Sequence, residues 1–173
     1  MARSSRKNAQ LFVLNNEFSI YETGVYCRLS VEDNGKADGD SIENQKDYIM
    51  DYLKNNSEFH FHDFYIDNGY SGTNFDRPQF QELLKDIKRN KIYCIIVKDL
   101  SRFGRNYIEV GEYLEHIFPL LGIRFISVND NYDSAKIKFG DPAALQLAIR
   151  NLLNDLYSKD ISRKIKSAVD LKK

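Results

Sequence analysis

A short, almost purely apolar run of residues, 92–97, restricts the possible folds of this chain more than any other feature. Such a strand, apolar on both faces, is typical of the interior of a parallel sheet. Residues 123–128 form a second, mostly apolar run. Between the two runs, residues 106–121 place apolar side chains at helical spacing, and Gly122 ends that pattern. Strand, helix and strand in this order predict two parallel strands joined by a crossover helix.

The preceding part of the chain shows the same alternation. Residues 24–30 alternate with period two, which predicts a strand with Arg28 and Ser30 on one face. The other expected elements are a helix capped near Asp40 and Ser41 and ending by residue 54, a strand near 59–66, a helix from about Pro78, and an edge strand at 135–139. We therefore expect an α/β domain with a mostly parallel central sheet and helices on both faces.

Length and composition agree with one folded domain. The chain has 173 residues, of which 42% are hydrophobic and 29% charged. Its longest apolar runs, of about six residues, are too short for a membrane span or a secretory signal, so we expect a cytoplasmic protein. Cys27 and Cys94 fall inside apolar runs and are expected to be reduced core thiols. Residues 1–20 are predicted to be a flexible arm, and residues 21–140 the folded domain.

The last segment, residues 141–173, differs in character. Asp141 and Pro142 suit the start of a helix, and about 28 residues without Gly or Pro follow. Such a helix would be about 42 Å long, and its apolar stripe would need a partner beyond its own domain. An ordinary packing helix that frays at its far end is the alternative. Because the segment ends in basic, helix-like sequence, we expect a longer parent protein.

The charge of the chain is polarised along its length. The formal net charge is zero, which at first argues against nucleic acid. Residues 1–86, however, carry a net charge of −6 and residues 87–173 one of +6. The basic half could therefore face a phosphate backbone.

Four arginines and one serine end or follow the predicted strands. Ligands of parallel α/β sheets collect beyond the carboxyl ends of the strands, where these residues should meet. They are Arg28, Ser30, Arg77, Arg102 and Arg105. A charged residue such as Arg28 inside a sheet requires an anionic partner or an open cleft. Each residue alone is a weak signal, but together they predict an anion site at one edge of the sheet.

This set of residue types suits phosphoryl chemistry. Guanidinium groups stay charged and donate paired hydrogen bonds to a phosphate whose negative charge grows in the transition state. A serine hydroxyl among them can attack the phosphorus and form a covalent ester. The arginines would supply the charge stabilisation that Mg²⁺ gives elsewhere, so we expect no metal and no other cofactor. The general base is left open between Asp99 and Asp33.

Four segments together resemble the catalytic domain of the serine recombinases, most of all the large recombinases of conjugative and mobilisable transposons. They are YCRLS at 26–30, SIENQ at 41–45, YSGTNFDRP at 70–78 and VKDLSRFGR at 97–105. The resemblance extends in order from about residue 22 to the end of the chain. It implies that Ser30 attacks a DNA phosphate, which gives a 5′-phosphoserine link and a free 3′ hydroxyl.

The resemblance also implies roles for other residues and for partners. The four arginines Arg28, Arg77, Arg102 and Arg105 would bind the phosphate, with Gln45 in a supporting role. The partners would be double-stranded DNA at recombination sites, a second copy in a homodimer, and a synaptic homotetramer assembled through the long helix. The setting would be a bacterial nucleoid, the outcome excision or insertion of a mobile element, and further DNA-binding domains would follow the catalytic one.

The chain departs from the family pattern at two places. Ser101 stands where resolvases and invertases usually have an aspartate, so the acid or base role of that aspartate does not carry over directly. The loop after Ser30 is also longer than in small resolvases.

Two other classes of function compete with the recombinase hypothesis. A receiver-like signalling domain would use Asp99 as its phosphoacceptor, but it also needs an acidic pair after the first strand, where Arg28 and Ser30 stand. A non-catalytic, DNA-associated assembly module would use the long helix without the serine.

Overall fold

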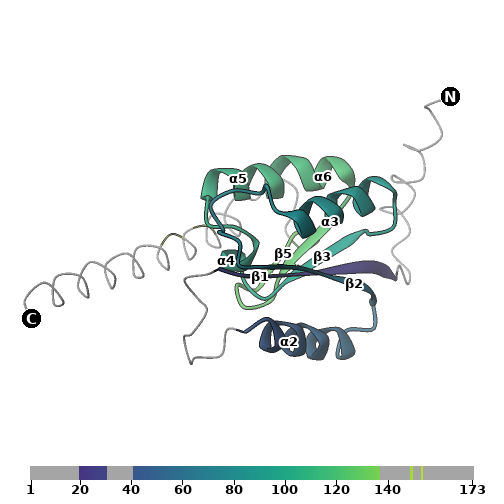
Figure 1. The fold of residues 1–173 in the computed structure, drawn as a ribbon. Coiled ribbons are helices and arrows are strands. Elements are labelled where there is room, and N and C mark those ends of the chain that lie inside the picture. The colour runs from purple at the N-terminus through teal and green to yellow at the C-terminus, as the bar shows by residue number, and fades with distance from the viewer. Residues whose placement is uncertain (1–19, 31–40, 137–148, 150–152, 154–173) are drawn as a thin grey trace, which may run out of the picture.

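The structure, a computed structural model, describes residues 20–30, 41–136, 149 and 153 (Figure 1). Its elements in chain order are β1 (Tyr21–Leu29), α2 (Ile42–Lys54), β2 (Phe59–Asn68), α3 (Pro78–Lys88), β3 (Cys94–Val97), α4 (Leu100–Phe103), α5 (Tyr107–Glu112), the π-helical turn η2 (Tyr113–Ile117), α6 (Phe118–Leu121), β4 (Arg124–Ser127) and β5 (Tyr132–Asp133).

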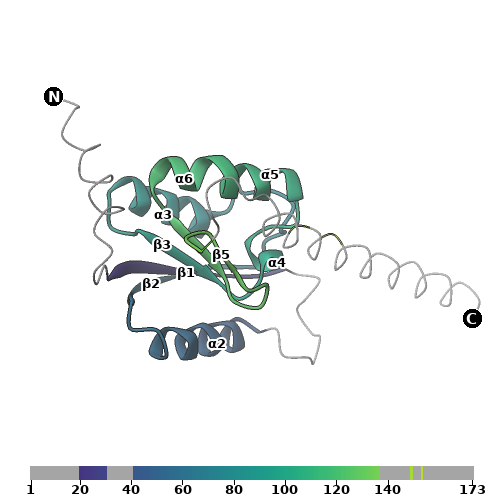
Figure 2. The same ribbon diagram turned by 180° about the vertical axis from the view of Figure 1, so that it is seen from behind.

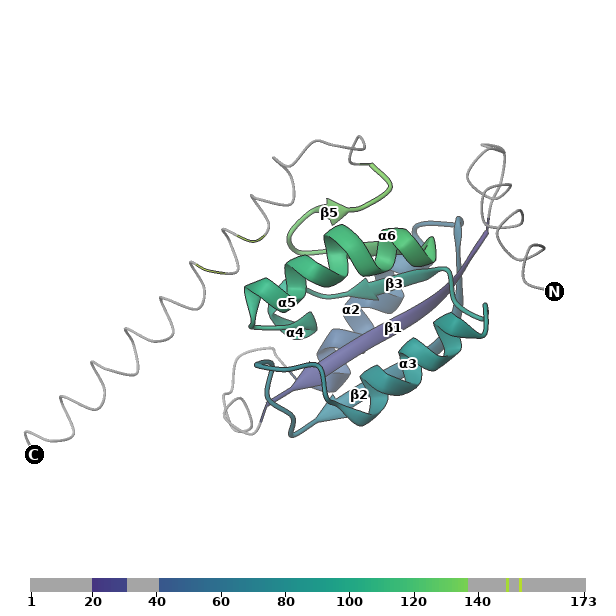
Figure 3. The same ribbon diagram turned by 90° about the horizontal axis from the view of Figure 1, so that it is seen from above.

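The strands form one sheet in the order β2-β1-β3-β4-β5. The first four are parallel to one another, and β5 pairs with β4 in the antiparallel direction. Helix α2 covers one face of the sheet, and α3, α5 and α6 cover the other (Figures 1 and 2). Seen from above, α3 lies along β2 (Figure 3), and α6 contacts β4. The expectation of a mostly parallel α/β sheet with helices on both faces is confirmed.

The alternation of β1 divides its side chains between two cores. Tyr26 belongs to the core under α3, α5 and α6, together with Phe80 and Phe125. Val25 and Cys27 point to the opposite side and join the core under α2, which also contains Cys94. Both cysteines are free and buried, as expected. Burial raises the pKa of the Cys27 thiol to about 12 and raises that of Cys94 as well.

Local hydrogen bonds explain where the helices begin and end. Ser41 caps α2, since its hydroxyl accepts a hydrogen bond from the Asn44 N–H at 3.1 Å. The helix expected at 106–121 is interrupted by the π-turn η2. There the N–H of Phe118 donates to the carbonyl of Tyr113, five residues back, directly before Pro119, which has no N–H to donate. Gly122 ends the helix in the left-handed conformation at φ 70°.

The edge strand lies earlier than expected. The sequence predicts it at 135–139, whereas β5 is Tyr132–Asp133 and residues 134–136 form a turn; residues 137–139 lie outside the described residues. The carboxylate of Asp133 accepts a hydrogen bond from the Ala135 N–H at 3.1 Å, and its carbonyl accepts one from Lys136 at 3.0 Å. These bonds turn the chain away from the sheet directly after β5.

Some expectations fall on parts of the chain that the structure does not describe. These are the arm at 1–20, apart from residue 20, the long helix at 141–173, apart from residues 149 and 153, and the loop at 31–40. Within the described ranges, no helix is both long enough and apolar enough to cross a bilayer.

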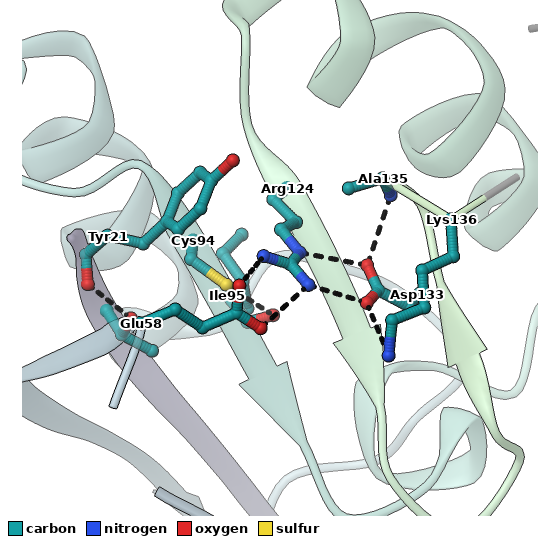
Figure 4. Close-up of polar contacts among 9 residues, drawn as sticks. Tyr21, Glu58, Cys94, Ile95, Arg124, Asp133, Ala135 and Lys136 are labelled. Atoms are coloured by element: carbon teal, nitrogen blue, oxygen red, sulfur yellow. Dashed lines mark hydrogen bonds and ion pairs between the residues drawn. The ribbon is translucent and has the colours of Figure 1, made fainter. Parts of the chain in front are cut away.

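A buried arginine, Arg124, connects the edge strand to the start of β2 (Figure 4). Its guanidinium donates to Asp133 at 2.7 Å and to Glu58 at 3.1 Å, and it lies 5.0 Å from the ring centroids of both Tyr21 and Phe59. Burial alone would raise the pKa of the Asp133 carboxyl, but the hydrogen bonds and charge of Arg124 bring it below its ordinary value. This ion pair therefore favours the folded state at neutral pH.

We predict that Asp133→Asn lowers the free energy of unfolding by about 3 kcal/mol at pH 7, because it removes one partner of a buried ion pair. The folded-state pKa of Asp133 is depressed, so its contribution is complete above the ordinary carboxyl pKa of about 4 and is lost as the pH falls through the folded value. The difference from the parent chain should therefore shrink below about pH 4. Urea unfolding at several pH values measures it.

The matched control is Lys54→Met. It removes the exposed pair that Lys54 makes with Asp51 at 3.9 Å, and its cost should stay below about 0.5 kcal/mol. Equal losses in Asp133→Asn and Lys54→Met at pH 7 would contradict the assigned role of the buried pair.

Candidate active site

Arg28 occupies the centre of the site, near the carboxyl end of β1, where α4 also lies (Figure 1). The residue is 0% exposed. Its guanidinium donates to three backbone carbonyls: to Tyr70 at 2.9 Å, to Ser101 at 2.8 Å and to Arg102 at 3.2 Å. The first carbonyl belongs to the β2–α3 loop and the other two to α4. Arg28 therefore joins two segments that are far apart in the sequence.

The backbone of Gly72 lies between Arg28 and Arg105. The N–H of Arg105 donates to the carbonyl of Gly72 at 2.7 Å. A Cβ atom at position 72 would lie 2.8 Å from Cγ of Arg105 and 3.0 Å from Nη2 of Arg28, both closer than ordinary contacts. Glycine is therefore required for the close approach of this loop to the two arginines.

Arg77 also binds both the β2–α3 loop and α4. It is 1% exposed and donates to the carbonyls of Asn74 at 2.8 Å and Phe103 at 2.9 Å, as well as to the hydroxyl of Tyr26. Its guanidinium carbon lies 4.6 Å from the ring centroid of Phe75. Burial raises the pKa of Tyr26, so the phenol stays protonated and can accept from Arg77 while donating elsewhere.

Asp67 completes this network. Its carboxylate accepts the Tyr26 hydroxyl at 2.9 Å and the backbone N–H groups of Gln79 and Phe80, both at 3.0 Å. The carboxylate thus satisfies donors in the first turn of α3 and fixes the helix relative to β1. Asp67 is also the register partner of Arg28 in the pairing of β1 with β2.

Asp99 organises the short helix α4. Its carboxylate accepts the N–H of Arg102 at 3.1 Å and the hydroxyl of Ser101 at 2.5 Å. The side chain of Arg102 is buried, and its Nε lies 3.9 Å from the second carboxylate oxygen. Because this carboxylate caps a helix and binds a hydroxyl, its environment differs from that of an open phosphoacceptor, which disfavours the receiver-like hypothesis.

Ser30 and Gln45 lie beside Arg28 but come from different elements. Ser30 directly follows β1, two residues beyond Arg28, and is 3% exposed. Gln45 comes from α2, where its side chain accepts the N–H of Arg28 at 3.3 Å and donates to the Arg28 carbonyl at 3.2 Å. Gln45 therefore fixes the backbone of the strand end. Asp33, the other candidate base, lies outside the described residues.

The charges of the other three arginines act on Arg28. Burial, followed by repulsion from Arg105, Arg77 and Arg102, lowers the pKa of the Arg28 guanidinium to about 10. The group remains protonated at neutral pH but is less stable there than in water. An anion bound near Arg28 would relieve this repulsion, so the arrangement is suited to a phosphate.

Three residues of the network are not apparent as site residues from the sequence. The only sequence signal for Tyr26 is the alternation of the strand, which places Tyr26 on the same face as Arg28. Asp67 meets Arg28 only because β2 pairs with β1, and this strand order does not follow from the sequence. The need for glycine at position 72 appears only when the loops from β2 and β3 are brought together.

Comparisons with known proteins agree on one family. Residues 23–173 match the family model described as "Resolvase, N terminal domain". The chain is similar to the N-terminal catalytic domain of TP901-1 integrase, with 27% identity, a TM-score of 0.62, and coverage of 80% of this chain and 97% of that one. It is also similar to a resolvase family site-specific recombinase from Streptococcus pneumoniae, with 26% identity, a TM-score of 0.57, and coverage of 88% and 97%.

A third structure shares the fold. The C-terminal catalytic domain of ISC1926 TnpA, an IS607-like serine recombinase, is 21% identical, with a TM-score of 0.51 and coverage of 62% of this chain and 70% of that one. No curated protein sequence matches the chain.

We predict that Gly72→Ala lowers the free energy of unfolding by about 1–3 kcal/mol, because the new methyl group overlaps Arg105 and Arg28. Gly111→Ala is the matched control, since its Cβ would meet nothing closer than 3.9 Å and alanine favours the helix. Thermal unfolding of the two variants measures the difference. A melting temperature for Gly72→Ala as high as that of Gly111→Ala would show that the loop does not need glycine.

Proposed function

The chain belongs to the resolvase family, and on that premise we propose that it is a serine recombinase catalytic domain that cleaves and rejoins double-stranded DNA through a 5′-phosphoserine intermediate. Similarity to catalytic domains of a site-specific recombinase and an integrase supports recombination as the activity. The observation that carries the proposed chemistry is the cluster of Arg28, Arg77, Arg102 and Arg105. Burial, and then repulsion from the other three arginines, lowers the pKa of Arg28.

The proposed reaction exchanges one phosphoester for another. The Ser30 oxygen attacks the phosphorus of the DNA backbone and loses its proton to a general base. The bond from phosphorus to the 3′ oxygen breaks, and that oxygen takes up a proton. In the reverse step a 3′ hydroxyl attacks the phosphoserine and releases Ser30. The number of phosphoester bonds is unchanged, so the cycle needs no ATP.

The proposed task of the arginines is to stabilise charge on the phosphate. Three of the five N–H groups of Arg28 already bind carbonyls, which fixes the direction of its remaining donors. Negative charge that grows on the phosphate oxygens during attack would be stabilised by guanidinium groups that need no reorganisation. Because Ser30 and Arg28 are buried, we expect neighbouring chain to move when DNA enters.

Other residues are proposed to position this cluster. Gln45 binds the backbone of Arg28, and the carbonyl of Ser101 accepts a hydrogen bond from the Arg28 guanidinium. Asp99 orients Ser101 and Arg102, and it remains a candidate for the general base. Ser101 replaces the usual aspartate, but its hydroxyl binds the carboxylate of Asp99, which brings a carboxylate to the same part of the site.

The assembly and setting are proposed on the family resemblance. Recombination of two duplexes requires two sites in one complex, which fits a homodimer that pairs into a synaptic tetramer on double-stranded DNA. The long helix of residues 141–173 is the proposed dimer contact. Such a protein would act at the bacterial nucleoid, in the excision or insertion of a mobile element.

We predict that Ser30→Ala eliminates covalent attachment of DNA while noncovalent DNA binding persists, because only the attacking oxygen is removed. The assay incubates the protein with a plasmid carrying the DNA that flanks its own gene, stops the reaction with detergent and detects DNA bound to protein. Protease treatment should expose a blocked 5′ end and a free 3′ hydroxyl. Ser57→Ala, in an exposed turn, is the control and should react like the parent chain.

Covalent DNA at parental levels in Ser30→Ala would remove Ser30 from the mechanism. Absence of any covalent product with the parent protein would instead favour the non-catalytic assembly module.

We predict that Arg102→Lys slows formation of the covalent product by about a hundredfold or more, as the loss of one preorganised donor does at other anionic transition states. A lysine keeps the charge but not the planar pair of donors. Single-turnover rates at saturating protein measure the effect. An unchanged rate would show that Arg102 does not contact the phosphate through its guanidinium fork.

A further inference from the structure

Two exposed tyrosines border the arginine cluster and have no part in the mechanism above. Tyr70 is 41% exposed and Tyr107 47%, whereas Tyr26, Tyr65 and Tyr132 are buried. Among the described residues, no hydrogen bond involves the hydroxyl of Tyr70 or Tyr107. Both rings therefore present apolar faces to water without a structural task in the fold.

Backbone contacts place both tyrosines at the arginine cluster. The carbonyl of Tyr70 accepts a hydrogen bond from Nη1 of Arg28 at 2.9 Å. Tyr107 is the first residue of α5, two residues after Arg105, whose N–H donates to Gly72 at 2.7 Å. The loop that carries Tyr70 and the segment that leads to Tyr107 are thus joined directly at the cluster.

The start of α5 is itself held in place. Asn106 accepts a hydrogen bond from the Ile108 N–H at 3.1 Å and donates to Glu109 at 2.7 Å, so the backbone at Tyr107 lies in a capped first turn. A ring attached to this position starts from a fixed point beside Arg105. Tyr70 is similarly anchored through its carbonyl, although its side chain is exposed.

We propose that the aromatic rings of Tyr70 and Tyr107 bind the nucleotides that adjoin the phosphate held by the arginine cluster. This inference rests on the proposed function, because it takes DNA as the ligand of the cluster. In a duplex the base faces are stacked on one another, so the rings would pack against the sugars and exposed base edges of the adjoining nucleotides while the arginines hold the phosphate. The two rings would contact the DNA strand next to the phosphate that faces Ser30.

A protein partner fits these tyrosines less well. Exposed aromatic rings also occur at protein interfaces. Here, however, both tyrosines belong to segments that border the arginine cluster, where the other three arginines add to the effect of burial in lowering the pKa of Arg28. The same edge of a second copy would bring further positive charge toward the cluster, which opposes association. A polyanionic strand would have the opposite effect.

The test measures DNA binding in the Ser30→Ala background, so that no covalent product forms. The probe is a fluorescein-labelled duplex of about 20 base pairs from the DNA used in the cleavage assay, and the readout is fluorescence anisotropy. The variants are the pair Tyr70→Ala with Tyr107→Ala, and the pair Tyr70→Phe with Tyr107→Phe. The matched control is Tyr48→Ala, which removes a 44% exposed tyrosine from α2, on the other face of the sheet.

The alanine pair should raise the dissociation constant about tenfold, because two ring contacts are lost. The phenylalanine pair and Tyr48→Ala should stay within about twofold of the parent. The dependence of binding on salt should be unchanged in all variants, since no charge is removed. Thermal unfolding shows whether the alanine pair folds, and the phenylalanine pair tests the ring contact without loss of bulk.

Affinity of a folded alanine pair equal to that of Tyr48→Ala would overturn the inference. So would a loss in the phenylalanine pair as large as in the alanine pair, because the hydroxyls would then be the contacting groups. Changed self-association in sedimentation, with DNA affinity unchanged, would assign the tyrosines to a protein interface and also overturn it. Failure of the proposed function has a different signature, the absence of covalent DNA when Ser30 is intact.

Discussion

A guanidinium group removed from water, that of Arg28, connects the parts of this molecule on which its chemistry depends. A buried charge without a partner costs several kcal/mol, so the surrounding backbone must supply compensation. Here the compensation comes from three carbonyl dipoles contributed by the β2–α3 loop and by α4. The two loops are held together because both bind the same charge. Their positions in turn determine where Arg102, Arg105 and Tyr70 lie.

Two of the buried arginines, Arg124 and Arg28, have opposite electrostatic environments. Arg124 binds the carboxylates of Asp133 and Glu58; burial alone would lower its pKa, but these contacts raise it above an already high ordinary value. Arg28 binds only carbonyls through its side chain and lies among like charges, and its pKa falls to about 10. A saturated ion pair such as that of Arg124 contributes to folding. An arginine that keeps an unbalanced charge retains affinity for an external anion.

Periodicity and local signals predicted much of the fold, because these depend on nearby residues. The buried strand near 92–97, the cap at Ser41 and the stop at Gly122 follow from side chains within one or two turns. The arginines of the site were also predictable, as charged residues at strand ends. The π-turn before Pro119, the short helix α4 and the position of β5 depend on individual hydrogen bonds that no periodic pattern encodes. The Tyr26–Asp67–Arg77 network needed the strand order as well.

The two buried cysteines have a practical consequence for studying motion in this protein. Cys27 and Cys94 both contribute to the core beneath α2, and burial raises the pKa of each thiol. Alkylating reagents attack the thiolate, which is scarce at neutral pH in such surroundings. Modification should therefore proceed only when α2 separates from the sheet. The rate of alkylation would then report the rate at which α2 separates from the sheet, without the introduction of any label.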